Sequence, residues 1–214
     1  MSNFTYQYGE KNCKNEYYEW DNLWWDNVPD RNVERVLIIG DSISCGYRRK
    51  TTKIADGKYF VDGLGTSKAL DDPAFIPLVD YVLAQEDNLR IIQVNHGLHG
   101  WHLNDETEYK EYFIKLIEHL LEKRPDSKLV IALTTPTRNL NNLEEYGEEI
   151  ERVKARNKSA LEIAEKFNLP VNDLYSVVIN SPELYSKDGV HLNDEGYMLL
   201  AQQTHEIISD LMNL

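Results

Sequence analysis

Two segments that lie far apart in the sequence hold a serine, an aspartate and a histidine that could act together as a nucleophile and its base. Gly40-Asp41-Ser42 follows a short apolar run, and Asp188-Gly189-Val190-His191 precedes the last helical pattern of the chain. A serine hydroxyl attacks well when an imidazole takes its proton and a carboxylate holds the other ring nitrogen. Read singly, each segment is also an ordinary turn or helix-capping sequence. Their joint occurrence predicts a site in which Ser42, His191 and Asp188 meet.

A second set of residues could stabilise the negative oxygen that such an attack creates. Asn95 follows the apolar run Ile91–Val94, and its side-chain amide could donate a hydrogen bond to that oxygen. The backbone N–H of Ser42, at the start of a helix, could donate another. Backbone N–H groups in residues 63–67, which we predict to be a turn after a strand, could supply a third, and Gly65 is preferred because it lies deeper in the turn.

Strands and helices that alternate along the chain would have to position these residues. Apolar runs of strand length occupy residues 36–39, 91–94 and 129–133, with weaker strand candidates at 59–61 and 170–174. Apolar residues repeat at helical spacing over 75–82, 112–120, 150–164 and 197–211. This alternation predicts a parallel sheet between two layers of helices, with the functional loops at the carboxyl ends of the strands.

With these motifs, the chain resembles the superfamily of SGNH or GDSL-type serine hydrolases, which includes esterases and acetylesterases. The resemblance rests on Gly40-Asp41-Ser42, on Asn95 and on Asp188-x-x-His191, and the order of elements extends it over residues 33 to 213. It implies an α/β fold, a flavodoxin-like three-layer α/β/α sandwich with about five parallel strands. It also implies ester hydrolysis through an acyl-serine, without a metal or another cofactor.

By the same resemblance, Ser42 would be the nucleophile, His191 the base, Asp188 its orienting carboxylate and Asn95 an oxyanion donor beside the Ser42 N–H. Two departures stand out. The family's asparagine block usually reads Gly-x-Asn-Asp, whereas residues 93–96 read Gln-Val-Asn-His, and the family's glycine block has no unambiguous match.

The chain divides into an N-terminal arm, residues 1–32, and a hydrolase domain, residues 33–214. Eight of the 22 aromatic residues lie within the first 25 positions, mixed with Asn, Glu and Asp rather than spaced as a helical stripe. We expect an irregular arm whose rings pack on the body. The alternative is that the arm contributes to a substrate cleft or to a subunit contact.

Residues near Asn95 and after the run 129–133 have open roles. His96, His99 and His102 recur at a spacing of three, but no carboxylate or thiolate ligand framework surrounds them, so we predict no metal site. His99 or His96 could instead support the oxyanion loop or line the cleft. Trp101 is either a packed ring or a platform on which a sugar stacks, and Arg138 either binds a substrate carboxylate or caps a helix.

Composition excludes several classes of protein. With 23 Lys and Arg against 36 Asp and Glu the formal charge is −13, which argues against nucleic acid or an anionic membrane as a partner. From 46 to 68, however, six cations stand against two acids, which leaves open a small anionic substrate. No apolar run is long enough to span a membrane, no export signal is evident, and Cys13 and Cys45 make no disulfide framework, so we expect a cytoplasmic protein. Monomer and homo-oligomer both remain open.

The sequence therefore favours a serine ester hydrolase acting on an O-acylated small molecule or glycan. Acetyl is preferred to long acyl groups because the chain has no contiguous apolar lid segment. Two other hypotheses remain: a catalytically inactive module of the same fold that binds a carbohydrate or small molecule, and a flavodoxin-like cofactor binder.

Overall fold

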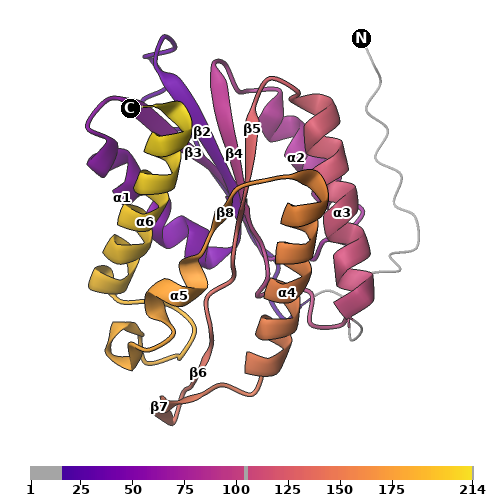
Figure 1. The fold of residues 1–214 in the computed structure, drawn as a ribbon, viewed down its shortest axis with the longest axis vertical. Coiled ribbons are helices and arrows are strands. Elements are labelled where there is room, and N and C mark those ends of the chain that lie inside the picture. Colours follow the sequence, from indigo (N-terminus) through magenta and orange to yellow (C-terminus); the bar gives the residue numbers. More distant parts are fainter. Residues whose placement is uncertain (1–15, 104–105, 214) are drawn as a thin grey trace.

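The computed structural model describes residues 16–103 and 106–213, and it places a six-stranded sheet at the centre of the molecule (Figure 1). The order of strands in the sheet is β1-β3-β2-β4-β5-β8. The strands are β1 (Asp21–Trp24), β2 (Glu34–Gly40), β3 (Tyr59–Thr66), β4 (Leu89–Asn95), β5 (Lys128–Ala132) and β8 (Val171–Asn172), and a separate hairpin is formed by β6 (Arg138–Asn139) and β7 (Asn142–Tyr146). The helices are α1 (Ser42–Ala55), α2 (Phe75–Leu83), α3 (Glu106–Lys123), α4 (Ile150–Phe167), α5 (Leu174–Val178) and α6 (Asp194–Met212), with a short 3-10 helix η1 (Pro182–Leu184).

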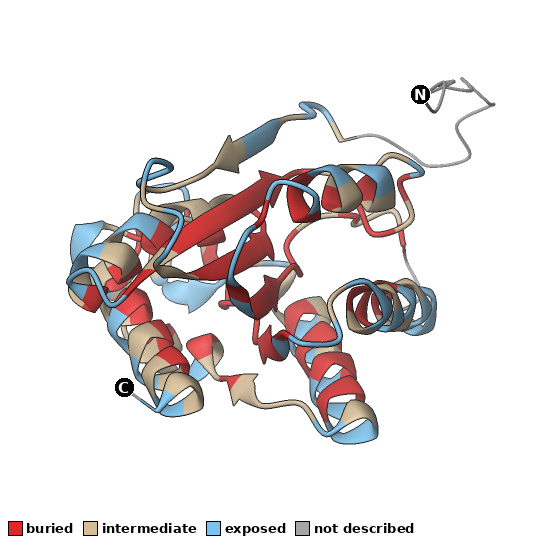
Figure 2. Ribbon diagram, turned by 90° about the horizontal axis from the view of Figure 1, so that it is seen from above, coloured by how far each residue is buried: buried red, intermediate tan, exposed pale blue. Residues whose placement is uncertain are grey.

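Helices cover both faces of the sheet, which confirms the predicted three-layer α/β/α architecture. Along β2, Leu37 and Ile39 pack with α2, α3 and α4, whereas Val36 and Ile38 pack with α1, α5 and α6. Both faces of β2 are therefore buried from solvent, as its unbroken apolar run predicts. Figure 2 shows the result, with burial concentrated on the sheet and on the helix faces turned toward it.

Five of the six strands are parallel, as expected, and the sixth comes from the N-terminal arm. β1 pairs antiparallel with β3, opposing Asp21 to Thr66 and Trp24 to Gly63. The prediction of an irregular arm is thus wrong for Asp21–Trp24, because the edge of β3 offers backbone groups that an extended segment can satisfy. Phe4, Tyr6, Tyr8 and Cys13 lie outside the described residues.

Two other local predictions also change. The expected turn at residues 63–67 is wrong, because β3 continues to Thr66 between β2 and β1. The strand expected at 170–174 shortens to Val171–Asn172, which pairs only with the end of β5.

The hairpin β6–β7 was not expected from the sequence. It extends beyond the carboxyl ends of the parallel strands, at the bottom of Figure 1. Among the residues that the structure describes, no helix combines the length and the apolar character that crossing a membrane requires.

Candidate active site

Strand register brings three segments of the predicted site into one row. Gly40, at the end of β2, pairs with Gly65 of β3 on one side and with Asn95 of β4 on the other. Asp41 follows Gly40 and caps α1, since its carboxylate accepts the Ile43 N–H at 2.9 Å. Ser42 is therefore held at the helix N-terminus directly beyond the middle strand of this row.

Ser42, His191 and Asp188 form a continuous hydrogen-bonded chain. The Ser42 Oγ and the His191 Nε2 are 2.8 Å apart, and the His191 Nδ1 lies 2.8 Å from the Asp188 Oδ2. The structure thus brings together three side chains from the two ends of the described chain, in the order that nucleophile, base and orienting carboxylate require.

The Asp188 carboxylate is held in its charged form by its own loop. Its Oδ1 accepts hydrogen bonds from the N–H groups of Val190 and His191, at 2.9 and 2.8 Å, and from the Ser186 hydroxyl at 2.8 Å. Burial works against the charge, but these bonds and the one to the His191 side chain lower the pKa of Asp188 to about 2. Asp188 is therefore ionised wherever a histidine can act as a base.

The two predicted oxyanion donors, the Ser42 N–H and the Asn95 amide, lie at the ends of adjacent strands in register. As the first residue of α1, Ser42 has a backbone N–H with no acceptor inside the helix. Asn95 is 2% exposed, and its Oδ1 accepts the Tyr47 hydroxyl at 3.1 Å, which fixes which end of the amide carries the donor. The Tyr47 oxygen in turn accepts from the Gln93 Nε2 at 2.9 Å, so Asn95 is positioned by a buried polar network.

The structure does not present the Gly65 N–H to this site. The Ser67 N–H donates to the Trp20 carbonyl at 3.1 Å, and hydrogen-bonded pairs alternate along an antiparallel ladder. Gly65 is two residues earlier, opposite Asn22, so its N–H also turns toward β1. Glycine is needed there for space: a Cβ would stand 2.3 Å from the Cys45 Sγ.

A cleft of about 410 Å³ reaches this hydrogen-bonded chain at Asp188. Its walls come from the loop after β4, from the hairpin β6–β7 with the start of the segment that follows, and from the loop of Asp188. The lining residues are Leu98, Trp101, Thr137, Arg138, Asn139, Leu140, Asn141, Tyr146, Gly147, Glu148, Glu149, Asp188 and Val190. Residues with aromatic rings, amides and carboxylates are therefore among those that line the cleft.

Trp101 both packs and lines the cleft. The Arg156 guanidinium lies 4.2 Å from the centre of its ring, and that of Arg152 lies 4.9 Å away. Arg156 is completely buried and donates to the carbonyls of His99 and Gly100, at 2.6 and 2.9 Å. The loop after Asn95 is thus clamped by arginines of α4.

The remaining predicted residues have separate roles. Arg138 caps a helix, as one alternative proposed, because its guanidinium donates to the carbonyl of Ile179 at the end of α5. His99 does not line the cleft; its Nδ1 lies 2.7 Å from the Glu16 carboxylate. His96 lies against the Lys68 carbonyl and His102 against Asp71, and within residues 16–103 and 106–213 no group of three or more His, Cys, Asp or Glu could hold a metal ion.

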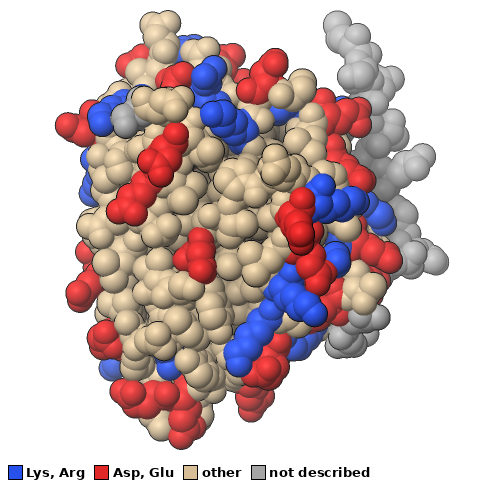
Figure 3. Space-filling view, viewed as in Figure 1, with Lys and Arg blue, Asp and Glu red and all other residues tan. Residues whose placement is uncertain are grey.

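None of the six cations between 46 and 68 lines the cleft. Lys50 pairs with Asp194, Lys68 pairs with Asp21, and Arg48 donates to Asn22. The charges that do line it are one arginine and three carboxylates, so the structure does not support the anionic-substrate hypothesis. On the face shown in Figure 3, both signs of charge are interspersed, and acidic side chains gather at the bottom, where β7 lies.

Sequence reasoning missed the hairpin residues that line the cleft, Asn139, Leu140, Asn141 and Tyr146. The only local signal is Asn139-Leu140-Asn141-Asn142, whose asparagines favour a tight turn. Ser186, which donates to Asp188, carries no signal in the sequence.

Comparisons with known proteins agree with this architecture. Residues 103–204, which include Asp188 and His191 but not Ser42 or Asn95, match the family described as GDSL-like Lipase/Acylhydrolase, which confirms the resemblance stated above. No curated protein sequence matches the chain significantly.

Solved structures with this fold are similar over most of the chain. A lipase/acylhydrolase from Enterococcus faecalis is 19% identical, with a TM-score of 0.65 over 83% of this chain and 96% of that one. A carbohydrate acetylesterase from Sinorhizobium meliloti is 18% identical, with a TM-score of 0.66 over 83% and 99%. An acetyl xylan esterase is 18% identical, with a TM-score of 0.65 over 81% and 99%. At these identities the likeness establishes the fold.

Proposed function

From its match to the GDSL-like lipase/acylhydrolase family, we propose that this protein is a serine ester hydrolase whose nucleophile is Ser42. The observation that carries the proposal is the chain of two 2.8 Å contacts from Ser42 through His191 to Asp188. A binding module without catalysis would not need this alignment.

In the proposed reaction, the Ser42 oxygen attacks the acyl carbonyl while His191 takes its proton. The Asn95 amide and the Ser42 N–H donate to the oxyanion of the tetrahedral intermediate. His191 then gives the proton to the departing alcohol, which leaves an acyl-serine. Water, deprotonated by the same histidine, releases the acid and restores Ser42.

We propose an O-acetyl ester of a carbohydrate or small molecule as the substrate. The cleft is lined by the aromatic residues Trp101 and Tyr146 and by the amide residues Asn139 and Asn141, a combination that suits a polar ring bearing hydroxyl groups. Two of the similar structures are described as a carbohydrate acetylesterase and an acetyl xylan esterase, which supports the same class.

The test uses p-nitrophenyl acetate and a fluorophosphonate probe. The wild type should hydrolyse the ester and be labelled, whereas Ser42→Ala should show only background hydrolysis and no label, with an unchanged thermal midpoint. Full turnover by Ser42→Ala would refute the assignment. Acetylated xylan oligomers against butyryl and longer esters then test the acyl and alcohol preferences.

A further inference from the structure

The N-terminal arm lies at the edge of the sheet where Ser42 is found. At one end it is fixed to β3, because the Trp20 N–H donates to the Ser67 Oγ at 2.8 Å. At the other end Glu16 accepts the N–H of Gly100, in the loop after β4, at 3.0 Å. The loop after β4 itself reaches the segment that follows β3, since the His96 Nε2 lies 2.8 Å from the Lys68 carbonyl oxygen, so the arm joins two segments that meet at this edge of the sheet.

Contacts of the Trp20 ring bring the arm close to Asp41 and His99. A Cβ placed on Gly65 would lie 3.5 Å from the Trp20 ring and 3.6 Å from the carbonyl oxygen of Asp41. The ring also meets His99 edge-on, with centres 6.1 Å apart. The arm is therefore a neighbour of the turn that carries the nucleophile.

The Glu16 carboxylate makes two bonds to the loop after Asn95. One oxygen lies 2.7 Å from the His99 Nδ1, and the other accepts the Gly100 N–H. This loop is held from the opposite side by Arg156, which donates to the His99 carbonyl. Glu16 is the contact through which the arm orients the His99 ring.

His99 is surrounded mainly by acidic groups. Burial disfavours its charge, but the bond to Glu16 and the charges of Asp41, Glu16 and Glu19 raise the pKa of His99. The basic groups near it are Arg156, which meets its carbonyl, and His96, whose ring centre is 6.4 Å away and whose pKa burial lowers to about 3. The acidic groups around His99 therefore favour its protonated form.

The Asp41 carboxylate needs such a partner. It is 2% exposed, and burial raises its pKa, while the charge of His99 and the N–H groups of Ile43 and Leu98 oppose that rise. Only the ionised form offers full acceptor strength to the helix N-terminus that begins at Ser42.

We propose that Glu16 is a positioning residue for the reaction: its carboxylate pairs with the His99 ring and holds it in place, and His99 in turn supports the Asp41 cap and the loop after Asn95. The inference rests on the proposed function. It makes the arm a part of the active site, although none of its described residues, from Glu16 on, forms a hydrogen bond with the Ser42 hydroxyl.

The test is the variant Glu16→Gln, which keeps an acceptor for the Gly100 N–H but removes the charge beside His99. At about pH 8, kcat for p-nitrophenyl acetate should fall about tenfold with KM within about twofold, as expected for the loss of one charge-assisted bond. At about pH 6 the ratio of variant to wild-type kcat should rise toward one, because His99 then protonates without Glu16.

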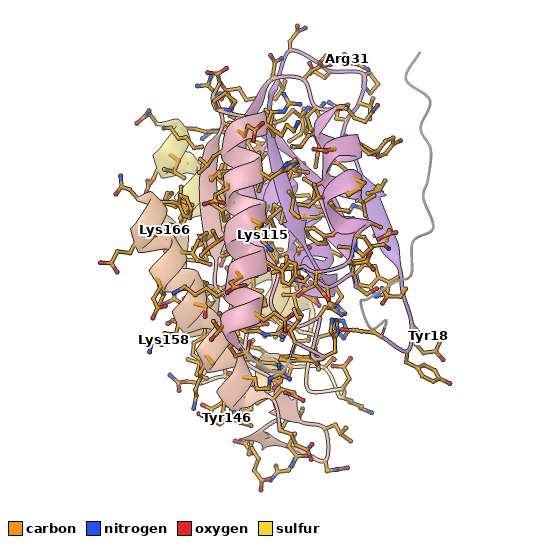
Figure 4. All side chains as sticks on the ribbon, turned by 90° about the vertical axis from the view of Figure 1, so that its right-hand side faces the viewer. Tyr18, Arg31, Lys115, Tyr146, Lys158 and Lys166 are labelled. Atoms are coloured by element: carbon orange, nitrogen blue, oxygen red, sulfur yellow. The ribbon has the colours of Figure 1, made fainter. Side chains whose placement is uncertain are left out.

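A second variant asks whether Glu16 acts through His99. In a His99→Asn background, Glu16→Gln should add no further loss of kcat. Tyr18→Ala is the matched control: Tyr18 belongs to the same arm, is exposed and points away from the body in Figure 4, and its loss should leave kcat unchanged.

Each outcome of these experiments either supports or overturns the proposal. Wild-type kcat in Glu16→Gln at both pH values overturns the proposal, and so does an equal loss at both, because a loss that ignores pH does not involve the charge of His99. Full additivity with His99→Asn also overturns it. A wild type that hydrolyses no acetyl ester and takes no fluorophosphonate label refutes the proposed function instead, and this inference with it.

Discussion

The backbone N–H of Arg138 donates to the carbonyl oxygen of Gly189 at 2.6 Å. Gly189 lies in the loop between Asp188 and His191, and Arg138 begins the hairpin that lines the cleft. The Tyr185 hydroxyl adds a second link, to the Pro136 carbonyl at 2.9 Å. The loop of the base and the wall of the cleft are thus one unit.

Gly189→Ala should move the loop of Asp188 and His191 away from the hairpin β6–β7. Gly189 has φ +71°, and a Cβ there would stand 2.2 Å from the Arg138 carbonyl oxygen, which is backbone and cannot move aside. We expect kcat/KM to fall at least about tenfold, since small misplacements of catalytic groups are costly. Steady-state kinetics with p-nitrophenyl acetate measures the loss.

Gly57→Ala is the control for backbone strain. Gly57 has φ +82°, and a Cβ there would meet no atom within 4 Å. Gly57→Ala should lower the free energy of unfolding by about 1 kcal/mol, because alanine disfavours the left-handed backbone conformation, and Gly189→Ala carries the same cost. Gly57→Ala should nevertheless keep wild-type kinetics. Equal kinetics in the two variants would show that the Arg138–Gly189 contact does not position the base.

Tyr47→Phe should weaken catalysis through Asn95. The missing hydroxyl leaves the Asn95 Oδ1 and the Gln93 Nε2 without their partner in a buried site. We expect a loss of about 1–3 kcal/mol in the free energy of unfolding. We also expect kcat to fall with little change in KM, because a freed Asn95 amide no longer points at the oxyanion.

Tyr59→Phe provides the comparison for the loss of a buried tyrosine hydroxyl. Its oxygen lies 2.6 Å from the His205 Nδ1 of α6 and touches none of the proposed site residues. This variant should lose stability but not kcat. If both variants lower kcat equally, the loss of activity comes from a general loss of stability and not from the contact with Asn95.

Asp188→Asn should lower kcat by about three to four orders of magnitude, because an amide at this position favours the wrong imidazole tautomer. Since the pKa of Asp188 is about 2, the deficit should persist at every pH above about 4. Asp188 is more than half exposed, so the stability that its charge adds is small; it is present above the ordinary value of 3.8 and is lost as the pH falls toward 2. Asp194→Asn, which removes an exposed carboxylate that pairs with Lys50, should keep wild-type kcat.

A pH-dependent stability should arise at the opposite end of the sheet, at Glu86. Burial, followed by the charge of Asp62, raises the pKa of Glu86 to about 8 from an ordinary 4.5. Between these values the folded chain holds a proton that the unfolded chain has released. Stability therefore falls as pH rises through this window, by at most about 1.4 kcal/mol per pH unit.

Glu86→Gln cannot ionise, so its stability should rise relative to the wild type between pH 5 and about 8, measured by urea unfolding. The neighbouring Asp87→Asn is the control, because the Asp87 carboxylate is exposed and pairs with Arg31 at the surface. A wild-type minus variant difference that does not change with pH would show that Glu86 is ionised in the folded protein.

The three-layer fold and the candidate triad could be predicted because their signals are local. An unbroken apolar run such as residues 36–39 marks a strand covered on both faces, and the polar residues that follow such strands must meet at one edge of a parallel sheet. Asn95 follows from the same rule, since β2 and β4 are neighbours in register.

The roles of single groups depend on contacts between distant segments, and no local pattern contains them. From the sequence alone, Gly65 is interpreted as a turn glycine with a free N–H. In the structure β1 pairs with β3, so the Gly65 N–H is directed to β1. The cluster of cations after Ser42 suggests a surface that binds an anion. In the structure, however, Lys50 and Lys68 form ion pairs with acids from other elements. In the sequence Glu16 is one acid among several in the N-terminal arm, and only the fold brings it to His99, 83 residues later in the chain. The sequence by itself determined the layers and the residues that could react, because burial and strand order follow from hydrophobic pattern; only the tertiary structure decided which polar groups remain free, because each hydrogen bond depends on where its partner folds.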